Sequence, residues 1–146
     1  MTTQCKQIFY NTHEYQQMVA LRFDVLRKPL NLIFGEEDLQ KDEHDFLIAA
    51  FDENKIIGCC ILKQLDNQIF KLRQMAVHEK YQQSGVGRQL IQFAENFSKQ
   101  KNIFSIEMNA RKNAVGFYKK LGYQIIGDEF WEVNISHFKM FKLLSN

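Results

Sequence analysis

The sequence predicts an α+β domain in which a mixed, mostly antiparallel sheet of about six or seven strands is flanked by helices. Three observations lead to this prediction. Three strand-like runs follow one another with only tight turns between them, an amphipathic helix pattern comes next, and further strand-like runs alternate with a second helical pattern. Since no repeat or linker interrupts the chain, we expect residues 1–146 to form a single domain.

The first part of the chain predicts one strand and one helix. Residues 6–10 have the composition of a short strand, and Asn11-Thr12-His13-Glu14 resembles a helix-capping sequence. Apolar residues at helical spacing then predict a helix to about Lys28, which stops before Pro29. Residues 31–44 are largely polar and acidic, which predicts an irregular segment with a helical turn.

The middle of the chain predicts an antiparallel meander. Its strands are residues 46–51, 56–65 and 68–77. Asp52-Glu53-Asn54-Lys55 separates the first two strands and Asp66-Asn67 separates the second two, and both sequences are typical of hairpin turns.

The last part of the chain predicts two helices and three strands. Asn113 is expected to cap the second helix, and Gly122 is expected to end it in a left-handed conformation. The expected elements, in order, are a helix over 85–100, a strand over 103–109, a short helix over 113–121, and strands over 123–126 and 137–143.

Composition argues against several classes of protein. The 19 basic and 17 acidic residues form no basic stripe, so we expect no nucleic-acid partner. The three cysteines are odd in number and two of them are adjacent, which argues against a disulfide framework and favours a reduced, cytoplasmic location. The lack of a CxxC pair argues against a zinc site, so no bound metal is expected. No signal-like start and no run of about 18 apolar residues is present, so no membrane association is expected. The 13 phenylalanines favour a second buried surface such as a homodimer contact.

A glycine-rich segment, Gln82-Gln83-Ser84-Gly85-Val86-Gly87-Arg88, lies between an apolar strand and an amphipathic helix. A glycine turn that opens a helix presents free backbone N–H groups and the positive end of the helix dipole, which together favour a phosphate. The segment lacks the G-x-x-x-x-G-K-[ST] sequence of a nucleotide P-loop. It also lacks the third glycine of a dinucleotide fingerprint, where Leu90 stands instead.

A second sequence follows the glycine-rich segment and changes its interpretation. It is Asn113-Ala114-Val115-Gly116-Phe117-Tyr118-Lys119-Lys120-Leu121-Gly122-Tyr123. In this order the two sequences resemble the pyrophosphate loop and the N-A-x-x-F-Y-x-K-x-G-[FY] helix of the GNAT superfamily of acetyl-coenzyme-A-dependent N-acetyltransferases. The expected strand order also matches that family, and the resemblance is good over residues 46–126.

The resemblance implies a site for acetyl-coenzyme A (acetyl-CoA). Backbone amides from Gln83 to Arg88 would hold the pyrophosphate, and Met75 and Val77 would bind the pantetheine arm. An amide near Met75 or Ala76 would polarise the thioester carbonyl, and Tyr118 would lie near the sulfur. The residues implied to contact the cofactor are Met75, Ala76, Val77, Gln82, Gln83, Ser84, Gly85, Val86, Gly87, Arg88, Asn109, Asn113 and Phe117.

Proton transfer needs an acid and a base. A phenol has a reference pKa of ~10, so Tyr118 would be protonated at neutral pH and could protonate the departing thiolate. The leading candidates for the base are Glu132 and His137, in a segment that resembles the C-terminal part of bacterial GNAT proteins with Ser136 in place of a usual proline. Glu107 and His44 are further candidates for residues of the substrate cleft. The arginines that could bind an anionic group of the substrate are Arg22, Arg27, Arg73 and Arg111.

The expected function is transfer of an acetyl group from acetyl-CoA to a primary amine of a small molecule, by direct attack within a ternary complex. Two alternatives remain open at this stage. The protein could bind coenzyme A as a sensor or regulatory module without turnover. It could also acetylate a protein lysine or N-terminus, and an open acidic cleft would favour that activity.

Overall fold

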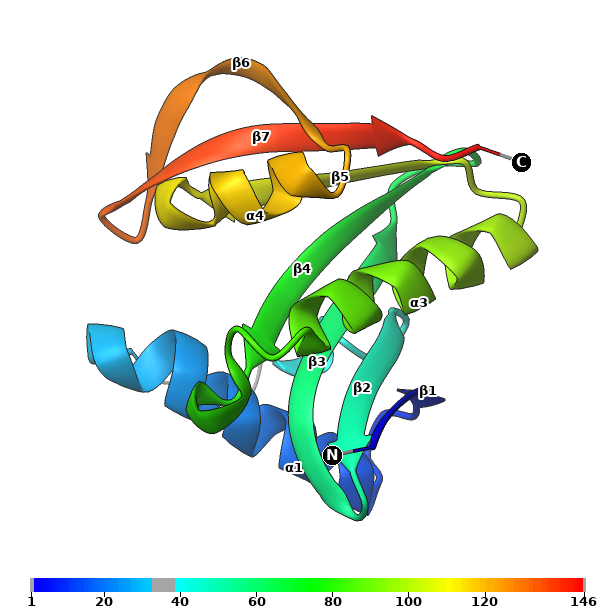
Figure 1. Ribbon diagram of the computed structural model, residues 1–146, viewed down its shortest axis with the longest axis vertical. Helices are drawn as coiled ribbons and strands as arrows, with labels where there is room; N and C mark the ends of the chain where they lie inside the picture. Colours follow the sequence, from blue (N-terminus) through cyan, green and yellow to red (C-terminus); the bar gives the residue numbers. More distant parts are fainter. Residues whose placement is uncertain (1, 33–38, 146) are drawn as a thin grey trace.

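The computed structural model describes residues 2–32 and 39–145, and within them the chain forms one seven-stranded sheet (Figure 1). The strand order is β1-β2-β3-β4-β5-β7-β6. β4 and β5 are parallel, and the other neighbouring strands are antiparallel, which confirms the predicted fold class. The strands are β1 (Thr3–Ile8), β2 (Phe46–Asp52), β3 (Lys55–Gln64), β4 (Ile69–Val77), β5 (Ser105–Arg111), β6 (Gln124–Glu132) and β7 (Ile135–Leu143).

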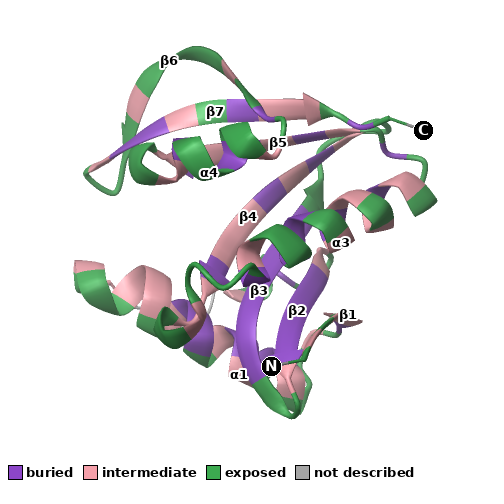
Figure 2. Cartoon of the chain, in the orientation of Figure 1, coloured by how far each residue is buried: buried purple, intermediate pink, exposed green. Residues whose placement is uncertain are grey.

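Helices cover both faces of the sheet. The helices are α1 (His13–Arg22), α3 (Val86–Gln100) and α4 (Val115–Lys120), with short helical turns η1 (Phe23–Arg27), η2 (Lys28–Leu30), η3 (Glu79–Tyr81) and η4 (Lys112–Ala114). α3 and α4 pack with one apolar cluster and α1 with another, so β2 and β3 are buried on both sides (Figure 2). No helix in the described ranges is long and apolar enough to cross a membrane.

The first helix is capped as the sequence predicts, but it changes its winding. The Thr12 side chain accepts a hydrogen bond from the Tyr15 amide at 3.2 Å. After Arg22 the chain continues as a π-helical turn and then as a 3-10 turn that includes Pro29. The helical turns therefore pass the proline and end at Asn31, whose φ is +57°.

A bulge in β4 changes which face its side chains occupy. Cys59 pairs with Ala76 and Ile61 pairs with Arg73, so Gln74 and Met75 together stand opposite Cys60 alone. Gln74 takes up the extra residue with a φ of +55°. Because of this shift, Met75 joins the face of the sheet that α3 and α4 cover, while Ala76 joins the face that α1 covers.

The sheet divides beyond the bulge. β4 and β5 pair over only four residues each, from Ile69 with Ser105 to Leu72 with Met108. Past these residues the two strands separate, and Figure 1 shows them diverging toward the ends that meet the loop before α3 and the start of α4.

Two local expectations are wrong. Asn113 does not cap the short helix, since it lies inside η4 and Ala114 occupies the cap position without a side-chain hydrogen bond. β6 runs through to Glu132, beyond the expected end near Ile126, because the chain forms a hairpin with left-handed Val133 and Asn134 at its turn. Gly122, with a φ of +97°, ends α4 as predicted.

Candidate active site

The N-terminus of α3 presents a set of backbone amides that make no hydrogen bond to the part of the chain that the structure describes. Gly85 is the cap residue, with a φ of +89°, and Gln83 is also left-handed at +67°. The first hydrogen bond of the helix runs from the Gln89 amide to the Gly85 carbonyl, at 3.1 Å. Within the described residues the amides from Gly85 to Arg88 therefore have no acceptor, and they lie at the positive end of a 15-residue helix.

The loop before α3 is exposed but anchored. The Gln82 side-chain amide donates to the Val77 carbonyl at 3.1 Å, which joins the loop to the end of β4. Both the amide and the hydroxyl of Ser84 donate to the Tyr81 carbonyl. Helix α3 in turn lies so close to β3 that a Cβ on Gly58 would come within 2.8 Å of the Leu90 side chain. The loop geometry is therefore fixed by the core packing of α3.

Gly87 brings three parts of the site together. A Cβ built on it would lie 3.0 Å from the ring of Phe117 and 3.5 Å from the terminal methyl of Met75. The first turn of α3, the bulged part of β4 and helix α4 therefore meet at this glycine.

We expect Gly87→Ala to preserve the fold but to lower acetyl-CoA affinity about 10-fold, because the new methyl must displace the Phe117 ring. The ring is 37% exposed, so it can move without disturbing the core. Gly116→Ala is the control, since nothing lies within 4 Å of a Cβ there. The acetyl-CoA affinity of both variants is measured by calorimetric titration. Equal affinities would contradict the expectation that a methyl group at position 87 disturbs acetyl-CoA binding.

A pocket lies where β4 and β5 separate. η4 contributes Ala114 and α4 contributes Tyr118 from one face of the sheet, and the turns after α1 contribute residues from the other face. The β6–β7 hairpin contributes a third wall. The residues that line the pocket are Leu26, Arg27, Leu30, Leu32, Leu72, Arg73, Gln74, Met75, Met108, Asn109, Ala110, Arg111, Ala114, Tyr118, Glu132, Val133 and His137.

The structure brings many of the sequence-predicted residues to this pocket. Tyr118, Glu132 and His137 all line it, although they come from a helix and from the two strands of a hairpin. Met75 and Asn109 line it as well. The remaining residues implied to contact the cofactor lie outside the pocket lining: Ala76 and Val77 end β4, Gln82 to Arg88 form the loop and first turn of α3, and Asn113 and Phe117 lie in η4 and α4.

Tyr118 is buried with its ring in an aromatic cluster. It is 6% exposed, and its ring centroid lies 5.0 Å from that of Phe117 and 5.9 Å from that of Tyr123. Burial, with a smaller effect of Cys60, raises the pKa of the Tyr118 phenol above its ordinary value. Its hydroxyl makes no hydrogen bond within the described chain. The side chain is therefore a protonated donor at neutral pH.

His137 is the more constrained of the two candidate bases. Its ring is 4% exposed and stacks on Phe130 at a centroid distance of 5.7 Å. Nδ1 lies 2.8 Å from the Ile135 carbonyl oxygen, which can only accept a hydrogen bond. A neutral ring held in this way carries its proton on Nδ1 and leaves Nε2 as an acceptor. Glu132, at the end of β6, is exposed.

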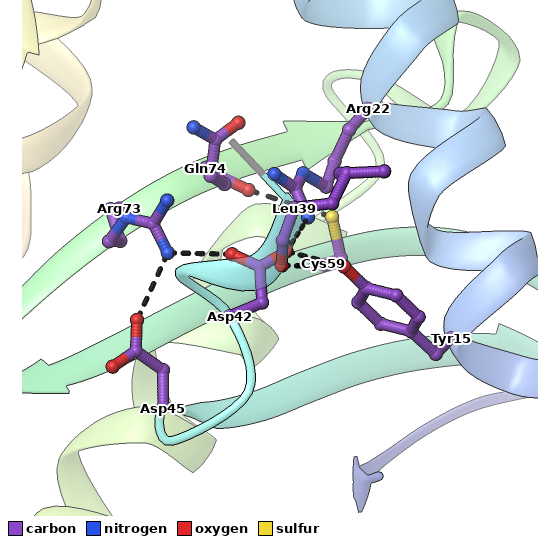
Figure 3. A network of polar contacts seen from close by, with 8 residues as sticks. All are labelled: Tyr15, Arg22, Leu39, Asp42, Asp45, Cys59, Arg73 and Gln74. Atoms are coloured by element: carbon purple, nitrogen blue, oxygen red, sulfur yellow. Dashed lines mark hydrogen bonds and ion pairs between the residues drawn. The ribbon is translucent and has the colours of Figure 1, made fainter. Parts of the chain in front are cut away.

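Behind the pocket lies a buried polar network that the sequence did not predict (Figure 3). Asp42 is fully buried and accepts hydrogen bonds from Arg22 at 2.7 Å, Tyr15 at 2.7 Å and Arg73 at 3.0 Å. Arg73 also contacts Asp45 at 3.1 Å. Burial opposes ionisation of Asp42, but the hydrogen bonds and charges of its partners outweigh it and lower the pKa of the carboxyl.

Three candidates for the substrate cleft lie elsewhere. Arg22 is 1% exposed and bound to Asp42, so it is not available to a substrate. The side chain of His44 is 90% exposed and outside the pocket. Glu107 pairs with Lys139 at 3.5 Å and does not line the pocket. The segment 31–44, which is expected to be irregular, contains the buried Asp42, and its residues 33–38 lie outside the described residues.

Comparison with known proteins assigns the chain to a family. The family described as the acetyltransferase (GNAT) domain matches residues 25–144. The YyaT protein of Bacillus subtilis is 32% identical over 110 residues, which cover 71% of this chain and 74% of that protein. ElaA of Escherichia coli has a TM-score of 0.82 at 15% identity, covering 97% of this chain and 99% of that one. A GNAT family acetyltransferase from Elizabethkingia anophelis, solved with acetyl-CoA bound, has a TM-score of 0.74 at 20% identity, covering 97% of this chain and 98% of that one. The chain described here belongs to the GNAT acetyltransferase family.

Proposed function

We propose that this protein transfers the acetyl group of acetyl-CoA to a primary amine of a small molecule, by direct attack within a ternary complex. The observation that carries the proposal is the pocket in the divided sheet. On one side it is lined by Met75 and Tyr118, and on another by Glu132 and His137. A donor for the leaving group and two candidate bases therefore border one space.

The same face of the sheet suits coenzyme A. The free amides from Gly85 to Arg88 would bind the pyrophosphate, and the open space around Gly85 leaves room for it. Met75 and Phe117, which meet at Gly87, would line the path of the pantetheine arm toward Tyr118. The acetyl-CoA in the Elizabethkingia anophelis structure supports this assignment.

During the reaction the charge changes at three atoms: the carbonyl oxygen, the sulfur and the amine nitrogen. The neutral amine attacks the thioester carbonyl carbon, and negative charge forms on the carbonyl oxygen. A backbone amide beside the β4 bulge, near Met75 or Ala76, would stabilise that oxygen, and such a donor is worth about 3–4 kcal/mol. When the carbon–sulfur bond breaks, Tyr118 would give its proton to the thiolate. The amine would lose its extra proton to His137 or Glu132, directly or through water.

The tautomer of His137 makes it the favoured base. Because Nδ1 faces the Ile135 carbonyl, Nε2 is the atom able to take a proton at the pocket. We expect His137→Gln to lower kcat/KM about 100-fold and to remove the acidic limb of its pH profile. The exposed Glu132, changed to Gln, is expected to lower kcat/KM less than 10-fold and to keep that limb. An unchanged acidic limb in His137→Gln would remove His137 from this role.

The form of the pocket supports a small acceptor. Its walls come from β4, β5, α4, the turns after α1 and the β6–β7 hairpin, and its described lining includes Arg73 and Arg111 but only one carboxylate, that of Glu132. An open acidic cleft suited to a protein lysine is not what these residues form.

Two measurements test the proposed function. Titration with acetyl-CoA is expected to give saturable binding, and no binding at millimolar concentration would contradict the proposal. A panel of small amines is then incubated with acetyl-CoA, and the free thiol and the acetylated product are quantified. If the protein binds acetyl-CoA but acetylates no amine or peptide and does not hydrolyse the thioester, a coenzyme A sensor would be favoured instead.

A further inference from the structure

The charged side chains at the pocket are mostly positive. Among the residues that the structure describes, three guanidinium groups line it, those of Arg27, Arg73 and Arg111, together with one carboxylate, that of Glu132. Two further carboxylates, Asp42 and Asp45, lie behind Arg73 and are balanced by Arg22 and Arg73. The described lining of the pocket therefore carries more positive than negative groups.

Arg73 is held in place with donors to spare. Both of its carboxylate contacts use one atom, Nη1, which lies 3.0 Å from Asp42 and 3.1 Å from Asp45. A guanidinium has five N–H donors, so Nε and Nη2 remain for a ligand. The side chain is 18% exposed and fixed between two carboxylates, so binding a ligand costs little further ordering.

Arg111 carries the charge that is not balanced locally. It ends β5, directly opposite His137 of β7, and it lines the pocket. Within the described chain no carboxylate lies within ion-pair distance of it. The neighbouring Lys112, by contrast, is 68% exposed, pairs with Glu129 at 3.9 Å and does not line the pocket.

We infer that the acceptor amine carries an anionic group, a carboxylate or a phosphate, which Arg73 and Arg111 bind where β4 and β5 separate. The inference rests on the proposed function and names its substrate class. Planar guanidinium groups bind both anions through paired, charge-assisted hydrogen bonds. With the anion held there, the amine end reaches the part of the pocket bordered by Met75, Tyr118 and His137.

The same charges disfavour a polycationic acceptor. A second ammonium group on the substrate would lie beside the guanidinium groups of Arg73 and Arg111, with Glu132 as the one carboxylate among the described residues of the lining. Like charges close together in a partly buried site repel one another strongly. Diamines and other polyamines are therefore expected to be poorer acceptors than amines with one anionic group.

The test compares matched acceptors. Short ω-amino acids are compared with amino alcohols of the same chain length, and phosphoethanolamine with ethanolamine, so that a carboxylate and a phosphate are tested separately. For each acceptor, kcat/KM is measured with acetyl-CoA, and binding is measured by calorimetry with the coenzyme-A-loaded protein. The variants are Arg111→Gln and Arg111→Lys, with Lys112→Gln as a control that removes a neighbouring positive charge outside the pocket.

We expect Arg111→Gln to lower kcat/KM and affinity for anionic acceptors about 10- to 100-fold. Arg111→Lys should restore part of the loss, and Lys112→Gln should leave the values unchanged. The amino alcohols should respond little to any variant. Equal use and equal binding of charged and neutral acceptors by the parent would overturn the inference while leaving the proposed function intact. Charge-selective binding without transfer would support the inference and overturn the proposed function.

Discussion

Tyr118→Phe is expected to lower kcat about 100- to 10,000-fold, because the variant cannot protonate the departing thiolate. The fold should not change, since the phenyl ring fills the same space between Phe117 and Tyr123. Acetyl-CoA affinity should also stay within a few-fold of the parent. Single-turnover kinetics with saturating amine measure the chemical step separately from product release.

Tyr123→Phe is the matched control for this experiment. Tyr123 is also a buried tyrosine, its ring packs on Tyr118, and its hydroxyl donates to Glu95 at 3.0 Å rather than lining the pocket. Its loss should reduce stability slightly and leave the chemical step almost unchanged. If Tyr118→Phe had the same single-turnover rate as this control, Tyr118 would not be the proton donor.

Asp42→Asn is expected to destabilise the fold by about 3–5 kcal/mol, because it breaks the buried ion pair between Asp42 and Arg22. Arg73 loses one of its two carboxylate contacts at the same time. Urea unfolding at neutral pH measures the change. Glu43→Gln, an exposed neighbour, is the control and should stay within about 0.5 kcal/mol of the parent.

The contribution of Asp42 also has a defined pH dependence. The pKa of its carboxyl is lowered in the fold, so its ionised form stabilises the protein above the unfolded value near 3.8. That stabilisation is lost as the pH falls through the lower, folded pKa. The difference in the free energy of unfolding between the parent and Asp42→Asn should therefore become smaller in strong acid. Burial raises the pKa of Asp45, so its protonation as the pH falls stabilises the fold, in contrast to protonation of Asp42. A difference that did not narrow would contradict an ionised Asp42.

Much of the fold could be predicted because its elements are locally encoded. The meander from Phe46 to Val77 has strand composition and turn residues, and α3 has one apolar face. The bulge at Gln74 could not be predicted, since it depends on how β3 pairs with β4. The length of β6 was also missed, because its exposed residues lack the alternation of a half-buried strand.

The candidate site was predicted unevenly for a similar reason. The glycine-rich loop and Tyr118 lie in continuous sequence patterns, so a resemblance could assign them roles. The Asp42 network joins α1, β4 and the chain before β2, and nothing in the sequence links Asp42 to Arg22 and Arg73. An acidic residue among polar neighbours resembles a solvent-exposed one until the fold brings two arginines to it.

The bulge in β4 places residues that are close in sequence on opposite faces of the sheet. Arg73 is bound to Asp42 on the α1 side of the sheet, while Met75, two positions later, packs with the apolar cluster of α3 and α4. A mutation at Arg73 can therefore change the proposed anion contact without changing the packing of α3 and α4, whereas a mutation at Met75 changes that packing and also the wall of the shared pocket. One short stretch of strand thus contributes to the proposed acceptor contacts and to the proposed coenzyme contacts.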